Sequence, residues 1–191
     1  MYGKENNRNQ AEKEKEDMRL YARQKVFSFR TVFSITDERG NDRYRVRGEL
    51  LTLGKRLHVY DNNGREVAMI RQRLLNLLPT YDIYIGGRHA ARIVKKITLL
   101  RPSYVIRGCN WKVQGNFLQH DYRIYRGMSA IAGIRKRWLS FGDCFELDVP
   151  ERENELLSVC MMLVIDCVMD AEEAARSSGA NSVANINSDN Q

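Results

Sequence analysis

Hydrophobic and polar residues alternate with a period of two along most of the chain. For example, Tyr81, Ile83 and Ile85 alternate with Asp82 and Tyr84. This alternation is typical of antiparallel strands that have one buried face and one wet face. With Asn-Gly and Gly-Gly pairs as turn signals, it predicts twelve strands near residues 21–29, 32–36, 43–49, 55–60, 66–73, 80–85, 88–97, 103–107, 111–115, 121–126, 129–137 and 143–149.

The chain also contains an internal repeat. Residues 70–85, IRQRLLNLLPTYDIYI, align without gaps with residues 134–149, IRKRWLSFGDCFELDV. Upstream, VRGELL at 46–51 matches VQGNFL at 113–118. Such self-similarity predicts one architecture built from two similar halves.

One helix is predicted after the strands, near residues 153–175. Pro150 and three following glutamates suit a helix N-terminus, and 12 of the 14 residues from Leu156 to Met169 are apolar. A helix that is apolar on all sides must be surrounded, and a run of this length is more often a buried core helix than a membrane span. We therefore predict a mainly β fold: a closed antiparallel barrel of about twelve strands around a central hydrophobic C-terminal helix. Asp166 is expected at the barrel mouth or with a hydrogen-bonding partner.

The two ends of the chain differ in composition from its middle. Residues 1–17 and 176–191 are polar and predict flexible tails, which leaves 18–175 as the barrel domain. Four cysteines without metal or disulfide spacing, and an N-terminus without a signal-like apolar stretch, predict a cytoplasmic protein with no transmembrane segment. We expect a monomer.

Several stretches together resemble the LURP-one-related family of the Tubby C-terminal-like superfamily. They include residues 18–70, RPSYVIRG at 101–108, WKVQGNFLQHDYRIY at 111–125, RKRWLSFGDCFELDV at 135–149 and ELLSVCMMLVIDCVMD at 155–170. The resemblance implies a barrel of about twelve strands around a hydrophobic helix, a fold shared with phospholipid scramblases. It implies no enzymatic activity; better-known relatives bind phosphoinositides or act at membranes. No ligand-contacting residue of those relatives can be matched to a position here.

The charge is concentrated in the predicted barrel. Residues 18–145 carry 25 basic and 9 acidic side chains, a net charge of +16. A body this basic attracts anionic lipid headgroups, nucleic acid or an acidic partner, although it could also serve only to solvate the barrel exterior. Arginine suits phosphate because its planar fork donates two bonds together. The candidate anion-binding or lipid-binding residues are Arg43, Arg45, Arg47, Arg71, Arg73, Lys95, Lys96, Arg101, Arg135, Lys136 and Arg137.

Apolar residues follow the repeated arginines in both halves. They are Leu74, Leu75, Leu77 and Leu78 in the first half, and Trp138, Leu139 and Phe141 in the second. These tips could touch the acyl boundary of a membrane while the arginines hold headgroups. The interpretation that we favour is that the tips fold over the barrel ends and seal the lumen.

No pattern indicates catalysis, a metal or a cofactor. The stretch from Gly48 to Arg56 has one residue too many between its glycines for a phosphate loop, and Arg56 replaces the required Ser or Thr. His120 and Asp121 would point to opposite faces of a strand, and Cys144 has no evident base. The helix methionines and cysteines are expected to be core.

We therefore predict a non-enzymatic binding domain that recognises anionic phospholipid headgroups, peripherally at a membrane surface. The alternative is a protein-interaction or scaffold module with no lipid role. Nucleic acid is the weaker candidate, because the sequence shows no aromatic stacking platform or reading helix.

Overall fold

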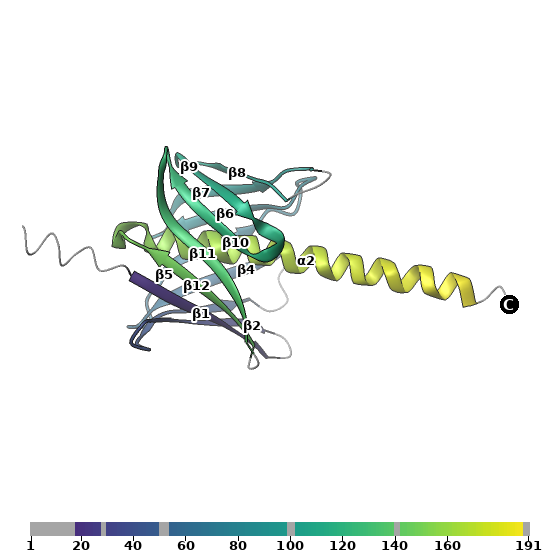
Figure 1. The fold of residues 1–191 in the computed structure, drawn as a ribbon, viewed down its shortest axis with the longest axis horizontal. Coiled ribbons are helices and arrows are strands. Elements are labelled where there is room, and N and C mark those ends of the chain that lie inside the picture. Colours follow the sequence, from purple (N-terminus) through teal and green to yellow (C-terminus); the bar gives the residue numbers. More distant parts are fainter. Residues whose placement is uncertain (1–17, 28–29, 50–53, 99–101, 140–141, 189–191) are drawn as a thin grey trace, which may run out of the picture.

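Twelve antiparallel strands and one long helix make up the fold (Figure 1). The structure is a computed structural model, and it describes residues 18–27, 30–49, 54–98, 102–139 and 142–188. The strands are β1 (Met18–Phe27), β2 (Arg30–Asp37), β3 (Asp42–Gly48), β4 (Arg56–Asp61), β5 (Glu66–Gln72), β6 (Thr80–Ile85), β7 (Arg88–Lys95), β8 (Tyr104–Arg107), β9 (Trp111–Asn116), β10 (Asp121–Arg126), β11 (Ser129–Leu139) and β12 (Gly142–Val149). The helix is α2 (Glu155–Ser188).

The sheet curls into a barrel because β1 pairs with β12 as well as with β2. The strand order is β8-β7-β6-β5-β4-β3-β2-β1-β12-β11-β10-β9, so the sheet ends at β8 and β9. These two strands lie near each other, but no ladder joins them among the described residues. Aromatic packing covers this seam: the ring of Tyr104 lies 4.9 Å from Phe117, which lies 5.3 Å from Tyr122. The predicted barrel is confirmed, but it is nearly closed rather than closed.

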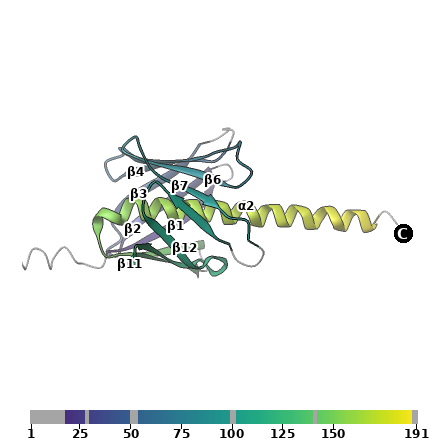
Figure 2. The same ribbon diagram turned by 90° about the horizontal axis from the view of Figure 1, so that it is seen from above.

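The core is the lumen of the barrel, and α2 fills it (Figures 1 and 2). Between Ser158 and Val168 every helix residue is buried. Each strand contributes its inward side chains at every second position, as in β4, where Leu57 and Val59 are buried. The helix is apolar on all sides because side chains surround it on all sides, as the sequence predicts.

At each rim of the barrel, a glutamate of α2 contacts a basic residue of a strand. At the proximal rim, where α2 begins, Glu155 is bound by Arg43 of β3. At the distal rim, where α2 leaves the barrel, Glu172 lies against Lys95 of β7. The loop between β5 and β6 also lies at the distal rim, because the backbone N–H of Lys95 donates to the carbonyl of Pro79 in that loop (3.0 Å).

The helix is longer than predicted. It runs to Ser188, whereas the sequence pattern predicted an end near residue 175. From Ala171 onward the described side chains are mostly exposed, so about 27 Å of helix project beyond the distal rim (Figure 1). The apolar pattern ends where the barrel ends, but no proline interrupts the chain after Pro150, so hydrogen bonding along the helix continues. Residues 1–17 lie outside the described residues, and the division into barrel and tails stays a prediction.

Asp166 lies inside the barrel rather than at its mouth, with a relative exposure of 1%. Burial, followed by the nearby charge of Asp166, raises the pKa of Tyr122 far above its ordinary value. In the described part of the chain, no helix combines the length and the hydrophobicity that crossing a membrane requires.

Candidate functional site

A cleft of about 310 Å³ lies on the outer wall of the barrel, over β4, β5 and β6 and beside the β5–β6 loop. We call it the cationic cleft. Three arginines and one carboxylate supply the charges of its lining, which consists of Arg56, Arg71, Gln72, Arg73, Leu74, Leu75, Asn76, Asp82 and Tyr84.

Strand register brings two of these arginines together. Leu57 and Ile70 point into the core, so Arg56 and Arg71 point outward, and the two arginines are direct partners across the β4–β5 ladder. Like charges directly opposite each other in a sheet are destabilising, by up to about 1 kcal/mol. Arg56 contacts Glu49 (3.0 Å), whereas no ion pair of Arg71 occurs among the described residues. An anion bound between the two guanidinium groups would offset their repulsion.

Asp82 fixes the base of the cationic cleft. It lies directly across from Arg71 on β6 and is buried although it faces outward, because three side chains cover it. Its carboxylate accepts from Arg92 Nε (2.6 Å), His89 Nε2 (3.1 Å) and Arg73 Nη1 (3.2 Å). Burial tends to raise the pKa of Asp82, but the hydrogen bonds from Arg92, His89 and Arg73 outweigh it and lower the pKa to about 2.

This depressed pKa predicts a specific loss of stability in acid. The ionised Asp82 contributes stability that is fully present above the pKa of the unfolded state, near 3.8, and is lost as the pH falls toward 2. Between about pH 5 and pH 2 we expect wild type to lose about 1–2 kcal/mol more unfolding free energy than Asp82→Asn, allowing for screening of the exposed arginines. Urea unfolding at stepped pH measures this difference, and parallel curves for the two proteins would contradict it.

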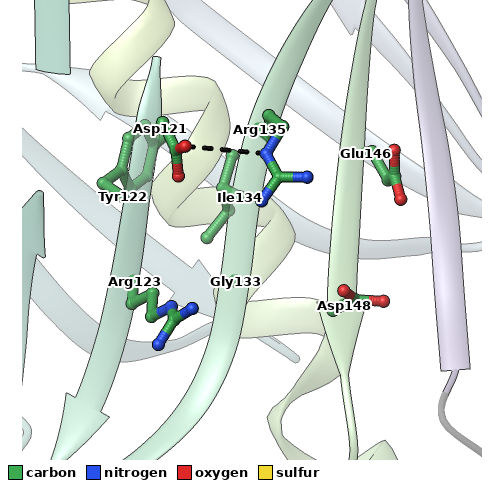
Figure 3. A pocket seen from close by; sticks show the side chains of 8 residues that line it. All are labelled: Asp121, Tyr122, Arg123, Gly133, Ile134, Arg135, Glu146 and Asp148. Carbon is green, nitrogen blue, oxygen red and sulfur yellow. Dashed lines mark ion pairs between the residues drawn. The ribbon is translucent and has the colours of Figure 1, made fainter. Parts of the chain in front are cut away.

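A second, smaller cleft of about 70 Å³ lies at the repeat-related position on the other half of the barrel (Figure 3). We call it the mixed cleft. Arg135 faces Asp121 on one side and Glu146 on the other, just as Arg71 faces Arg56 and Asp82 in the first half. Its lining consists of Asp121, Tyr122, Arg123, Gly133, Ile134, Arg135, Glu146 and Asp148.

The two clefts carry opposite charge. The position of Arg56 is taken in the second half by Asp121, whose Oδ2 lies 3.6 Å from Nε of Arg135. The mixed cleft therefore holds two arginines and three carboxylates. Glu146, the counterpart of Asp82, is bound by Arg137 and lies 3.3 Å from Arg19. The repeat therefore accounts for the strand framework and the central arginine that the two clefts share. It does not account for the excess positive charge, which occurs in the cationic cleft and not in the mixed cleft.

Exposed leucines stand beside the cationic cleft. Leu75 and Leu77 are fully exposed (101% and 104%), and Leu74 is half exposed although its side chain packs on Gly54. The interpretation that these tips seal the lumen is therefore wrong for the first half, because α2 already fills the barrel. In the second half, Phe141 and the side chains of Trp138 and Leu139 lie outside what the structure describes.

Three other predicted site residues do not join an outer basic surface. Arg43 is held by Glu155 at the proximal rim, and Lys95 lies against Glu172 of the helix. Lys136 has inward parity, since it lies between the outward Arg135 and Arg137, and its ammonium is 5.3 Å from the ring centroid of Phe145. Strand alternation separates it from the arginines with which the sequence analysis grouped it.

The remaining predicted residues that the structure describes lie apart from the cationic cleft. Arg45 is exposed and contacts Asp42 (3.3 Å), Arg47 lies over the ring of Tyr60, and Lys96 is exposed near the distal rim. Arg101 lies outside the described residues. Of the predicted residues that the structure describes, only Arg71 and Arg73 line this cleft.

Sequence reasoning missed two arginines: Arg56 in the lining, and Arg92 on the neighbouring strand β7, where it binds Asp82. Their importance depends on cross-strand register: Arg56 lies opposite Arg71, and Arg92 lies opposite Asp82. The alternation in β4 and β7 gives the outward direction of both side chains. It does not give the residue on the neighbouring strand that each one meets.

Of the residues considered for catalysis, His120 and Cys144 are buried. His120 ends a 3-10 turn with a φ of 49° and packs edge-on against Phe145. Burial raises the pKa of the Cys160 and Cys167 thiols to about 12, which suppresses thiolate chemistry. Within the described ranges, no three His, Cys, Asp or Glu side chains are grouped so that they could hold a metal ion.

Fold and site together define a class of protein: an antiparallel barrel of twelve strands threaded by its own C-terminal helix, with an arginine-lined cleft on the outer wall. The sequence pattern of the LURP-one-related family matches residues 18–166, and the chain belongs to that family. The uncharacterized protein YxjI of Bacillus subtilis is 33% identical over 154 residues, which cover 81% of this chain and 95% of YxjI. An X-ray structure of an Arabidopsis thaliana protein superposes with a TM-score of 0.54 at 15% identity, covering 81% of this chain and 94% of that one. This last likeness concerns the fold alone.

Proposed function

We propose that this protein is a non-enzymatic binding domain that recognises anionic phospholipid headgroups at a membrane surface through the cationic cleft. The observation that carries the proposal is the direct pairing of Arg56 with Arg71 across β4 and β5, in a cleft that Arg73 also lines. Among the described residues of the lining, Asp82 is the one carboxylate, and three side chains already engage it. A phosphate group would supply the acceptor that Arg71 lacks among the described residues, since Arg56 contacts Glu49 and Arg73 contacts Asp82.

The mixed cleft supports this assignment by contrast. It has the same backbone framework and the same central arginine, but carboxylates surround that arginine. If the basic barrel exterior served only solubility, the two clefts would have no reason to differ in sign. The half that keeps three arginines also carries the exposed leucines, which favours a lipid surface over a small soluble anion.

Arg71→Ala is expected to weaken binding to anionic vesicles about fivefold, since a basic side chain near such a surface contributes about 1 kcal/mol. The measurement is co-sedimentation with phosphatidylcholine vesicles of graded phosphatidylglycerol content, at low and at physiological salt. The matched control is Arg135→Ala, which removes the same side chain from the mixed cleft and should leave binding unchanged. Equal losses for both variants would indicate a diffuse charge effect and contradict a site.

The same pair of variants separates binding from folding. Arg71 faces Arg56 on one side and Asp82 on the other, so Arg71→Ala removes a repulsion and an attraction together and should unfold within about 0.5 kcal/mol of wild type. Arg135→Ala loses its contact with Asp121 and should be as stable as wild type or slightly less stable.

The alternative function is a protein-interaction module. The observation that favours it is the length of helix that projects beyond the distal rim, which the barrel does not use for packing. Two results together would favour this alternative. Wild-type protein would not bind anionic vesicles at low salt, and it would bind a protein partner stoichiometrically until it is truncated after Asp170.

A further inference from the structure

We propose that Leu75 and Leu77 form a wedge that enters the acyl boundary of an anionic bilayer, while the barrel lies on its side with its helix parallel to the surface. This inference rests on the proposed function and adds the element that inserts and the orientation. Both leucines are fully exposed in a loop that contributes to the cationic cleft, so one approach to a membrane engages charge and apolar surface together.

The loop that carries the wedge is held at both of its ends. On one side Leu74 packs on Gly54, so closely that a Cβ on that glycine would lie 2.8 Å from the leucine side chain. On the other, the hydroxyl of Thr80 donates to the Leu78 carbonyl (2.9 Å), and the N–H of Arg73 donates to the Thr80 carbonyl (2.8 Å). Leu75 and Leu77 therefore stand between two fixed points and need little further ordering on insertion.

The positive charge of the cationic cleft indicates that the surface on which the two leucines dock is an anionic bilayer. Two exposed leucines supply too little apolar area for a stable protein interface, whose core usually buries many side chains. Weak insertion combined with headgroup attraction is sufficient for a membrane, because the two contributions add. The arginines of the same cleft provide that attraction.

The projecting part of α2 determines the orientation. It leaves the barrel at the distal rim, the rim that also carries the β5–β6 loop. It includes Glu172, Glu173 and Arg176, and charged side chains are costly in hydrocarbon. A rim-down approach would drive this segment into the bilayer. The wall formed by β4, β5 and β6 must therefore face the surface, which leaves α2 lying along it.

The first measurement compares Leu75→Ser/Leu77→Ser with Met128→Ser. Met128 is equally exposed but lies in the β10–β11 turn at the proximal rim, so it is a matched control. We expect the double variant to bind phosphatidylglycerol vesicles about 20-fold more weakly than wild type and the control to bind normally. Binding of soluble glycerol 3-phosphate, followed by NMR shifts of arginine side chains, should be unchanged in the single variant Leu77→Ser, whose position lies outside the cleft lining, and in Met128→Ser.

The outcomes separate the two proposals. A double variant that binds vesicles as well as wild type overturns the wedge and leaves headgroup recognition standing. Wild-type protein that binds neither vesicles nor glycerol 3-phosphate at low salt overturns the proposed function, and the wedge with it.

The second measurement tests the orientation with tryptophans and lipids brominated on their acyl chains. Quenching of Leu77→Trp above the baseline from Trp111 and Trp138 of wild type is the expected result. Leu118→Trp reports on another part of the distal rim, in the 3-10 turn between β9 and β10. It should not be quenched when the barrel lies on its side. Quenching at both positions would show a rim-down approach and overturn the proposed orientation.

Discussion

Arg43→Ala is expected to lower the free energy of unfolding by about 2–3 kcal/mol, because it removes the guanidinium from the buried carboxylate of Glu155 in a partly buried ion pair. Nη2 of Arg43 lies 2.9 Å and 3.0 Å from the two carboxylate oxygens of Glu155. Glu155 is 1% exposed at the first turn of α2, so its carboxylate depends on protein partners. Urea unfolding followed by circular dichroism measures the loss.

Two further variants define the cause. Arg45→Ala removes an arginine from the same strand, two residues away, whose contact with Asp42 is exposed; it should change stability by no more than about 0.5 kcal/mol. Arg43→Met combined with Glu155→Gln removes both charges and should recover much of the loss. If Arg43→Ala is as mild as Arg45→Ala, the pair does not anchor the helix at the proximal rim.

The second large effect is predicted for Gly115→Ala at the seam of the barrel. Gly115 has a φ of +147°, and an added Cβ would lie 2.5 Å from the backbone carbonyl of Asp121 and 2.5 Å from Cα of Tyr122. Backbone strain and overpacking together should cost about 3 kcal/mol or more. Because Tyr122 packs on Phe117, which in turn meets Tyr104 across the seam, the near-UV circular dichroism of these aromatic rings should change as well.

Gly133→Ala is the matched control for the seam variant. Gly133 lies on β11 without a positive φ, and the nearest atom to an added Cβ is the Cβ of Asp148 at 3.9 Å. Its stability should stay within about 0.5 kcal/mol of wild type. A wild-type melting curve for Gly115→Ala would show that the β9–β10 pairing relaxes easily, contrary to the tight approach of these two strands.

Membership in the LURP-one-related family does not by itself assign a function, because the relative YxjI is itself uncharacterized. The difference between the two clefts is useful for that reason. It arises within one chain, between two halves with the same framework, so each variant in the cationic cleft has a natural counterpart in the mixed cleft. A binding effect that is confined to the first half cannot come from net charge alone.

The sequence could predict the strand face on which a residue of the candidate site lies, but not whether a loop beside the site is exposed. Alternation places Arg71 on the outer face of its strand, and it would also have placed Lys136 on the inner face, apart from Arg135 and Arg137. The pattern predicts Arg73 as the last residue of the strand near 66–73, whereas β5 ends at Gln72. The exposure of Leu75 and Leu77 could not be predicted, because whether a loop covers a barrel end depends on what already fills the lumen.

The sequence by itself determined the strands, the two similar halves and the central helix, since periods of two and continuous apolar runs are local properties of the chain. Only the tertiary structure decided that Arg56 meets Arg71, that Asp82 is covered by Arg73, His89 and Arg92, and that Asp121 reverses the charge of the second cleft. The physical reason is register. Alternation fixes the face on which a side chain lies, whereas its neighbours on that face are set by hydrogen-bonded pairing with other strands, and shifting a strand along its partner changes every one of them.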